Sequence, residues 1–139
     1  MKPGYRFIDH TADFRVEIFG VDEKDLFIQA AKALTDLITD PRTLEDRHRQ
    51  ILTVNGDDWS DLMVNWLREL LYLWSGEERL VGRVVLQSLE PTRLRATVTT
   101  DAFDADRHPI RNEIKAVTYH QIEVRPWQAG WRARVVFDI

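Results

Sequence analysis

The stretch that decides the fold is YRFIDHTADFRVEIF, residues 5–19. Residues 5–8 carry aromatic and β-branched side chains, and residues 14–19 alternate apolar with charged side chains, so both runs are typical of strands. The polar residues between them, Asp9 to Asp13, are therefore expected to form a tight connection at the rim of a sheet, where side chains can converge. We interpret Asp13 as the anchor of this rim.

The far end of the chain supplies the expected partner of Asp13. Residues 131–137 alternate as a strand does, with an apolar side chain at every odd position. Asp138 then projects away from the apolar face, and the free α-carboxylate of Ile139 follows it. If the first and last strands are neighbours, these three carboxylates meet at one edge.

The composition is that of a single domain, residues 1–139, which is long enough to bury roughly 70% of the surface exposed by the unfolded chain. The absence of cysteine excludes disulfides, thiolate zinc sites and cysteine nucleophiles. No apolar run approaches the ~20 residues of a membrane span, and the first residues lack the apolar core of a signal peptide. We expect a soluble, cytoplasmic protein that makes no membrane contact.

The charge argues against a surface built mainly to bind nucleic acid, because the formal net charge is −4. Basic side chains do gather in residues 42–49, and they recur in two expected strands at Arg93 and Arg95 and at Arg132 and Arg134. We interpret these as solvated strand faces.

Two helices are expected. The first follows Asp22, a plausible N-cap, and carries one apolar stripe until the chain reaches Pro41. The second follows Asp57 or Asp58 and ends at residues 75–76. Its wider stripe consists of Trp59, Leu62, Met63, Trp66, Leu67, Leu70, Leu71 and Trp74. Burial at ~1.5–3 kcal/mol per side chain favours a core role for this stripe, and a partner-docking face is the alternative.

Four further strands are expected at residues 50–54, 83–89, 93–100 and 114–124. In the last of them, parity assigns one face to Ala116, Thr118, His120, Ile122 and Val124. The predicted fold class is α+β: a single domain in which a mixed or largely antiparallel sheet of about seven strands is packed by two helices.

Residues 101–109 form a loop with three aspartates that invites comparison with calcium loops. An EF-hand loop needs a glycine at its sixth position, a glutamate at its twelfth and flanking helices, whereas strands are expected here. We therefore predict a solvated loop.

The carboxylates of Asp13, Asp138 and Ile139 are hard ligands, which favour Ca²⁺ or Mg²⁺. In the alternative interpretation Asp13 caps a turn and Asp138 is a solvated end, and spacing alone favours this alternative. His10 and His120 would shift the preference towards zinc, but no paired-histidine motif supports them.

Four segments, taken in order, resemble the archease family from end to end. They are DHTAD at residues 9–13, NWLRELLYL at residues 65–73, EIKAVTYH at residues 113–120 and VFDI at residues 136–139. One departure is Arg15, at a position where many archeases have a small residue, often glycine. A bulky arginine there is expected to alter access to the site without removing a ligand.

The resemblance implies an accessory protein for an RtcB-type RNA ligase, which joins 2′,3′-cyclic phosphate or 3′-phosphate ends to 5′-hydroxyl ends in tRNA splicing and RNA repair. Such a protein is not itself an enzyme; it promotes GTP-dependent guanylylation of the ligase and multiple turnover. In the family, the residues matching Asp13, Asp138 and Ile139 bind a divalent cation, typically Ca²⁺, with Mg²⁺ or Mn²⁺ as alternatives.

Candidate contacts with the ligase or its nucleotide are Lys115, Arg107 and His120. A role as chaperone for an RNA-modifying enzyme such as a tRNA methyltransferase is the alternative within the family. A stand-alone metal-dependent hydrolase is disfavoured, because the sequence provides no evident general base beside the carboxylates.

Overall fold

The structure is a computed structural model that describes residues 2–9 and 13–139. In chain order its elements are β1 (Gly4–Asp9), β2 (Asp13–Gly20), α1 (Glu23–Ile38), the 3₁₀ turn η1 (Pro41–Thr43), β3 (His48–Asn55), α2 (Trp59–Ser75), β4 (Arg79–Glu90), β5 (Arg93–Ala102), β6 (Ala116–Trp127) and β7 (Gly130–Asp138). The predicted α+β class, with seven strands and two helices in one domain, is confirmed.

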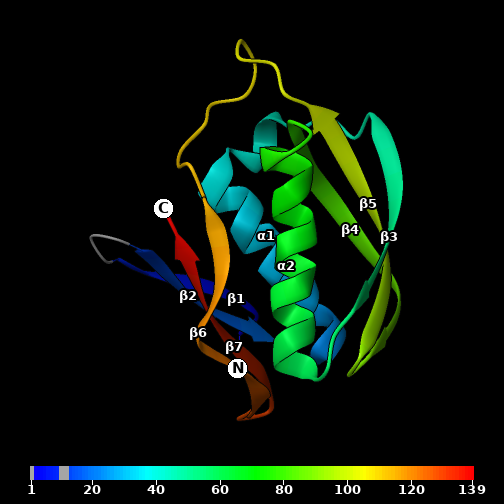
Figure 1. The fold of residues 1–139 in the computed structure, drawn as a ribbon, viewed down its shortest axis with the longest axis vertical. Helices are drawn as coiled ribbons and strands as arrows, with labels where there is room; N and C mark the ends of the chain where they lie inside the picture. The colour runs from blue at the N-terminus through cyan, green and yellow to red at the C-terminus, as the bar shows by residue number, and fades with distance from the viewer. Residues whose placement is uncertain (1, 10–12) are drawn as a thin grey trace.

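The seven strands divide into two antiparallel sheets rather than forming one. The first sheet has the order β1-β2-β7-β6 and the second has the order β3-β5-β4. Figure 1 shows both helices lying between the sheets, and each helix contacts strands of both. Neither helix is long and apolar enough to cross a membrane, and this holds for all of the chain that the structure describes.

Both helices begin in the same way. The Asp22 side chain accepts a hydrogen bond from the Asp25 amide at 2.8 Å, and the Asp58 side chain accepts one from the Asp61 amide at 2.8 Å. These contacts satisfy amide groups that the first turn of a helix leaves unpaired. The predicted caps are confirmed, and at the second helix the cap is Asp58 rather than the neighbouring aspartate.

A glycine precedes each cap because the chain passes close to the helix there. A Cβ atom on Gly56 would lie 2.6 Å from the Leu62 amide nitrogen, and one on Gly20 would collide with the backbone of Leu26. Only a residue without a side chain allows the preceding strand to turn so tightly into the helix.

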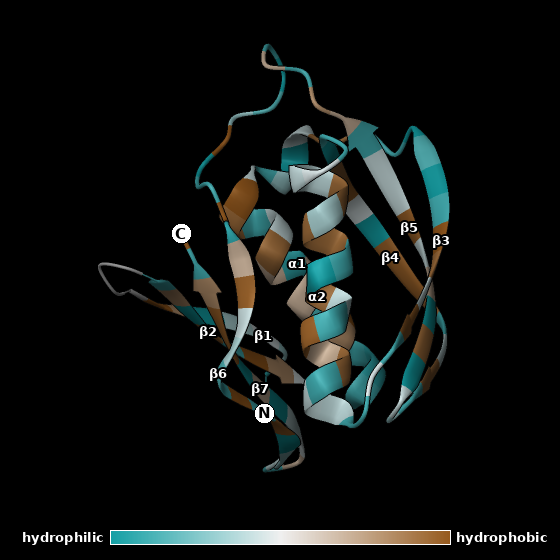
Figure 2. Cartoon of the chain, in the orientation of Figure 1, coloured by the Kyte–Doolittle hydropathy of each residue, from teal (hydrophilic) through white to brown (hydrophobic). Residues whose placement is uncertain are grey.

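The apolar stripe of α2 lies in the core, as the sequence predicts. Trp66 is fully buried, and its indole N–H donates to the Phe27 carbonyl of α1 at 3.0 Å. The stripe's terminal tryptophans are half-buried and pack on aromatic neighbours: Trp59 contacts Phe27 and Trp131, and Trp74 contacts Phe103. Figure 2 shows mixed hydrophilic and hydrophobic bands along the strands that flank the helices, as expected for sheets with one buried face.

The predicted faces of the strand at residues 114–124 are wrong, because β6 contains a large bulge. Thr118 pairs with Val136 and Glu123 pairs with Arg134, so residues 119–122 lie opposite the single residue Val135. His120, which parity places on the same face as the core-packed Val124, is exposed. A period-2 argument cannot detect such extra residues, and each one moves all later side chains to the other face.

The prediction of a solvated loop at residues 101–109 is wrong for two of its side chains. Asp101 and His108 are 1% and 2% exposed. The Asp101 carboxylate accepts from the Glu45 amide at 3.0 Å and from Arg107 at 3.2 Å, and the His108 ring lies 2.9 Å away. His108 Nδ1 accepts from the Asp104 amide at 3.0 Å, so Nε2 carries the proton and donates it to Asp101.

These contacts fix the long connection between β5 and β6, which arches over one end of the helices in Figure 1. Burial by itself raises the pKa of Asp101, but the hydrogen bonds from Glu45, Arg107 and His108 outweigh it and lower the pKa to about 2. The carboxylate is therefore ionised and fully engaged within the protein. That arrangement positions a loop and leaves little capacity for a calcium ion.

Candidate metal centre at the ends of the first and last strands

The structure brings Asp13 and Asp138 directly opposite each other. They form a residue pair in the antiparallel ladder between β2 and β7, next to the pair of Phe14 and Phe137. Phe137 is fully buried, so the two aspartates project from the other face of the sheet, away from the helices. Opposed residues of such a pair have Cβ atoms ~4.5–5.5 Å apart, which lets their carboxylates converge.

The Asp13 carboxylate has an oxygen that is buried yet unsatisfied. Its Oδ1 atom makes no hydrogen bond with any residue that the structure describes. Arg15 Nε lies 3.8 Å away, which is beyond hydrogen-bond distance, and among the described residues this nitrogen also has no hydrogen-bond partner although it is buried. A buried acceptor left unmatched costs about 1–3 kcal/mol or more, so this oxygen is available as a ligand.

The end of β7 is held from both sides. Asp138 pairs with Asp13 on β2 and with Ala116 on β6, and its carbonyl accepts from the Lys115 amide at 2.8 Å. Ile139 is half-buried and packs against the core, one residue beyond the paired aspartates. The two flanking strands therefore fix the position of the predicted rim, which consists of Asp13, Asp138 and Ile139. The exposed Lys115 side chain begins beside this rim.

The donor set suits a hard divalent cation. The side chains at this rim are carboxylates, which fit Ca²⁺, Mg²⁺ or Mn²⁺ better than softer metals. Over residues 2–9 and 13–139, no three or more His, Cys, Asp or Glu side chains cluster closely enough to hold a metal ion by themselves. The protein ligands would be Asp13, Asp138 and the α-carboxylate of Ile139, with water or a partner group completing the shell.

The other predicted residues have different surroundings. Arg107 contacts Asp101 and Asp104 within its own loop, so it would have to exchange these contacts to reach a partner. His120 lies exposed on the β6 bulge, and its amide donates to Thr118 Oγ1 at 3.2 Å. His10, in the connection before Asp13, lies outside the described residues. The contact roles of Arg107, His120 and Lys115 stay predictions.

The outer face beside the rim also presents Arg134, whose place in the sequence predicts a solvated strand face. Arg134 lies between the buried residues Ala133 and Val135, and it is paired with Glu17 of β2 on one side and with Glu123 of β6 on the other. The signal available in the sequence is the alternation of Arg132 and Arg134 with apolar residues. It shows that the two arginines share a face, but not which groups surround them.

Comparison with known proteins decides the family. Residues 5–139 match the model of the archease protein family (MTH1598/TM1083). The chain belongs to the archease family. The archease of Methanosarcina barkeri is 32% identical over 139 residues, covering 97% of this chain and 95% of that protein. The archease of Methanopyrus kandleri is 33% identical over 135 residues, covering 95% and 96%.

Solved structures agree with this archease fold. The solution structure of Methanobacterium thermoautotrophicum protein 1598 superposes with a TM-score of 0.82 at 29% identity, covering 98% of this chain and 99% of that one. The crystal structure of a Thermotoga maritima archease, described as a possible chaperone, has a TM-score of 0.65 at 23% identity, covering 100% and 97%. The second similarity bears on the fold alone. The resemblance read from the four sequence segments is confirmed.

Proposed function

We propose that this archease is an accessory activator of an RtcB-type RNA ligase, promoting its GTP-dependent guanylylation and its repeated turnover in tRNA splicing or RNA repair. The observation that carries the proposal is the pairing of Asp13 with Asp138 in a chain that matches the archease family over residues 5–139. The protein works through its partner in the cytoplasm rather than as an enzyme, and it meets RNA only through the ligase.

The rim is the surface that we expect to contact the ligase. Asp13 and Asp138, with the α-carboxylate of Ile139, would hold a divalent cation at the edge of the first sheet, and Ca²⁺ is the cation we propose. A cation held there would supply positive charge next to these carboxylates, and such charge favours binding of phosphate groups. Three adjacent strands keep the two aspartates in place, so little conformational entropy is lost when the rim docks.

Activation requires that the archease prefer one state of the ligase. A helper shifts a conformational equilibrium only by its difference in affinity for the two states, and a tenfold shift needs about 1.4 kcal/mol. The rim would provide this difference by contacting the nucleotide site only when GTP and metal are aligned for attack. Lys115 lies beside the rim and is the best-placed candidate for an added contact with a phosphate or an acidic group of the ligase.

The test is a reconstituted guanylylation assay with purified ligase, labelled GTP and this archease. The wild type is expected to accelerate ligase guanylylation, and Asp13→Asn or Asp138→Asn to abolish the acceleration. Glu90→Gln is the matched control, because Glu90 is an exposed carboxylate at the end of β4 in the second sheet. It should behave as the wild type does.

Two results would contradict the proposal. If wild-type archease leaves the guanylylation rate unchanged, the chain is not an activator of the ligase. If the two aspartate variants accelerate the reaction as well as the wild type does, the rim has no part in activation. A parallel pull-down with a tRNA methyltransferase tests the chaperone alternative, which predicts capture of that enzyme in place of the ligase.

A further inference from the structure

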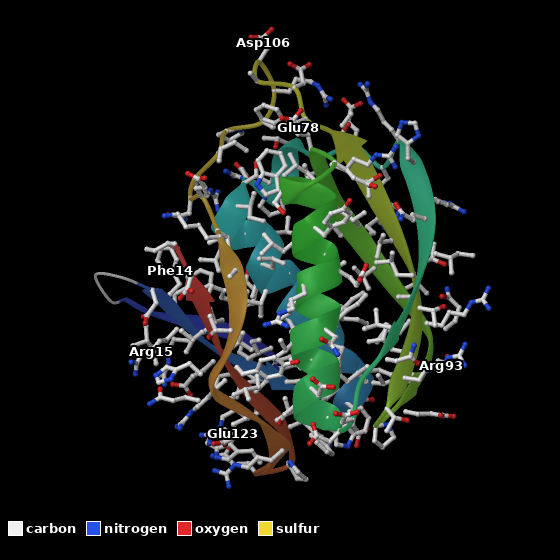
Figure 3. All side chains as sticks on the ribbon, in the orientation of Figure 1. Phe14, Arg15, Glu78, Arg93, Asp106 and Glu123 are labelled. Atoms are coloured by element: carbon white, nitrogen blue, oxygen red, sulfur yellow. The ribbon has the colours of Figure 1, made fainter. Side chains whose placement is uncertain are left out.

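A cavity of about 510 Å³ lies on the outer face of the first sheet, beside the rim. Its floor is formed by β2 and β7, Ile8 of β1 lies on one side, and Gln121 and Ile122 of the β6 bulge lie on the other. Figure 3 shows the side chains of Arg15 and Glu123 projecting on the side of this sheet away from the helices. The volume lies within the usual range of sites for small molecules, about 300–1,000 Å³.

The two carboxylates of this cavity are already neutralised. Glu17 accepts from Arg6 at 2.6 Å, and Glu123 accepts from Arg132 at 2.7 Å and from Arg125 at 2.5 Å. The hydrogen bond from Arg132, together with that from Arg125, outweighs burial and lowers the pKa of Glu123, so this carboxylate stays ionised and paired. The two lining glutamates thus leave little negative charge for the remaining cations.

Two arginines of the cavity remain available. In the part of the chain with described coordinates, Arg134 makes no ion pair and no side-chain hydrogen bond, and Arg15 approaches a carboxylate only at 3.8 Å. The Nε atom of Arg15 is buried and has no hydrogen-bond partner among residues 2–9 and 13–139, so the described structure gives this donor no acceptor. These two guanidinium groups are therefore the lining cations that can still accept an anionic ligand.

The strand register brings the two guanidinium groups within reach of one ligand. Arg15 lies opposite Val136, and Arg134 lies opposite Glu17, so the two arginines are diagonal neighbours on adjacent strands and share a face. Diagonal neighbours lie ~7–8 Å apart, within reach of two long side chains. The planar fork of arginine matches the oxygens of a phosphoryl group.

We propose that this cavity is a nucleotide-binding site in which Arg15 and Arg134 hold the phosphoryl groups and the apolar walls at Ile8 and Ile122 contact the nucleoside. The volume exceeds what a phosphate ion alone would fill, and the walls offer apolar surface that an inorganic anion would not use. This proposal depends only on the residues of the cavity. It therefore requires neither the ligase as a partner nor a cation at the rim.

The test is titration calorimetry of the full chain in EDTA, so that no divalent cation at the rim contributes. GTP, ATP, tripolyphosphate and guanosine are the probes. Wild-type protein is expected to bind a nucleoside triphosphate more tightly than tripolyphosphate, and Arg15→Gln or Arg134→Gln is expected to weaken that binding about tenfold or more. The control Arg93→Gln, on the second sheet, should bind as the wild type does.

Amide NMR spectra of the same proteins supply the location and confirm that each variant is folded. With GTP, shift changes should centre on residues 119–123 and 134–136. The proposal is overturned if neither GTP nor ATP binds at millimolar concentration, if both arginine variants bind as the wild type does, or if tripolyphosphate binds as tightly as GTP. Because the ligase is absent from these experiments, their failure would leave the proposed function untouched.

Discussion

Replacing Asp101 by asparagine should destabilise the fold in a pH-dependent way. The carboxylate is 1% exposed and accepts hydrogen bonds from the Glu45 amide, Arg107 and His108. Its pKa is lowered from 3.8 to about 2, a difference that corresponds to about 2 kcal/mol of stability at neutral pH. A neutral asparagine cannot provide this contribution, and it also presents an N–H₂ group to donors.

The sign of the pH dependence follows from the direction of the pKa change. Because the folded state lowers the pKa of Asp101, the folded protein gains stability from ionised Asp101 above about pH 4. That gain is lost as the pH falls towards about 2. The difference in unfolding free energy between wild type and Asp101→Asn should therefore shrink by about 2 kcal/mol over this interval.

Urea denaturation followed by the fluorescence of the five tryptophans measures this difference at pH 7, 5, 4, 3 and 2. Asp106→Asn is the matched control, since Asp106 is exposed at the tip of the same loop, as Figure 3 shows. It should change the unfolding free energy at pH 7 by less than about 0.5 kcal/mol. A gap between wild type and Asp101→Asn that stays constant from pH 7 to pH 2 would refute the ionised, buried role of Asp101.

Three further predictions concern the helices and the rim. Trp66→Phe removes the N–H donated to the Phe27 carbonyl and should lower the unfolding free energy by about 1–3 kcal/mol in urea titrations; unchanged stability would contradict the buried hydrogen bond. Asp58→Ala removes the cap of α2 and should lower the unfolding free energy by about 1 kcal/mol in the same measurement; an unchanged value would show that the cap is dispensable. Adding residues after Ile139 converts its α-carboxylate to an amide and should weaken Ca²⁺ binding in calorimetry, whereas equal affinity would exclude that ligand.

The helices and the strand ends could be predicted because their signals are local. A three- and four-residue apolar period defines each helix, and an aspartate three residues before its bonded amide marks each start. The meeting of Asp13 and Asp138 could be predicted only on the condition that the first and last strands are neighbours. Asp13 precedes one alternating strand, and Asp138 follows another. Their opposition in one residue pair is a matter of register, which the alternation alone does not set.

The features that could not be predicted depend on distant parts of the chain. The division of seven strands into two sheets depends on which strands pair on each side of the helices, and these pairings join distant parts of the chain. The bulge at residues 119–122 cannot be recognised from the sequence, because these residues continue a run that is typical of a strand. Burial of Asp101 depends on Glu45, a residue 56 positions away in sequence, whose amide satisfies the carboxylate.

The cavity on the outer face could not be predicted for the same reason. The sequence shows that Arg132 and Arg134 share a face, but it does not show that Arg132 is paired with Glu123 while Arg134 is left to the cavity. It also shows an arginine at position 15, two residues after Asp13. Only the register reveals that Arg15 and Arg134 are diagonal neighbours.

Titration of metal-free protein with Ca²⁺, measured by calorimetry at neutral pH, tests the central claim most directly. The opposed aspartates predict one binding event per chain, with affinity reduced at least about tenfold by Asp13→Asn or by Asp138→Asn and unchanged by Glu90→Gln. No binding to the wild type, or equal binding to the wild type and both aspartate variants, would show that the rim is not a cation site.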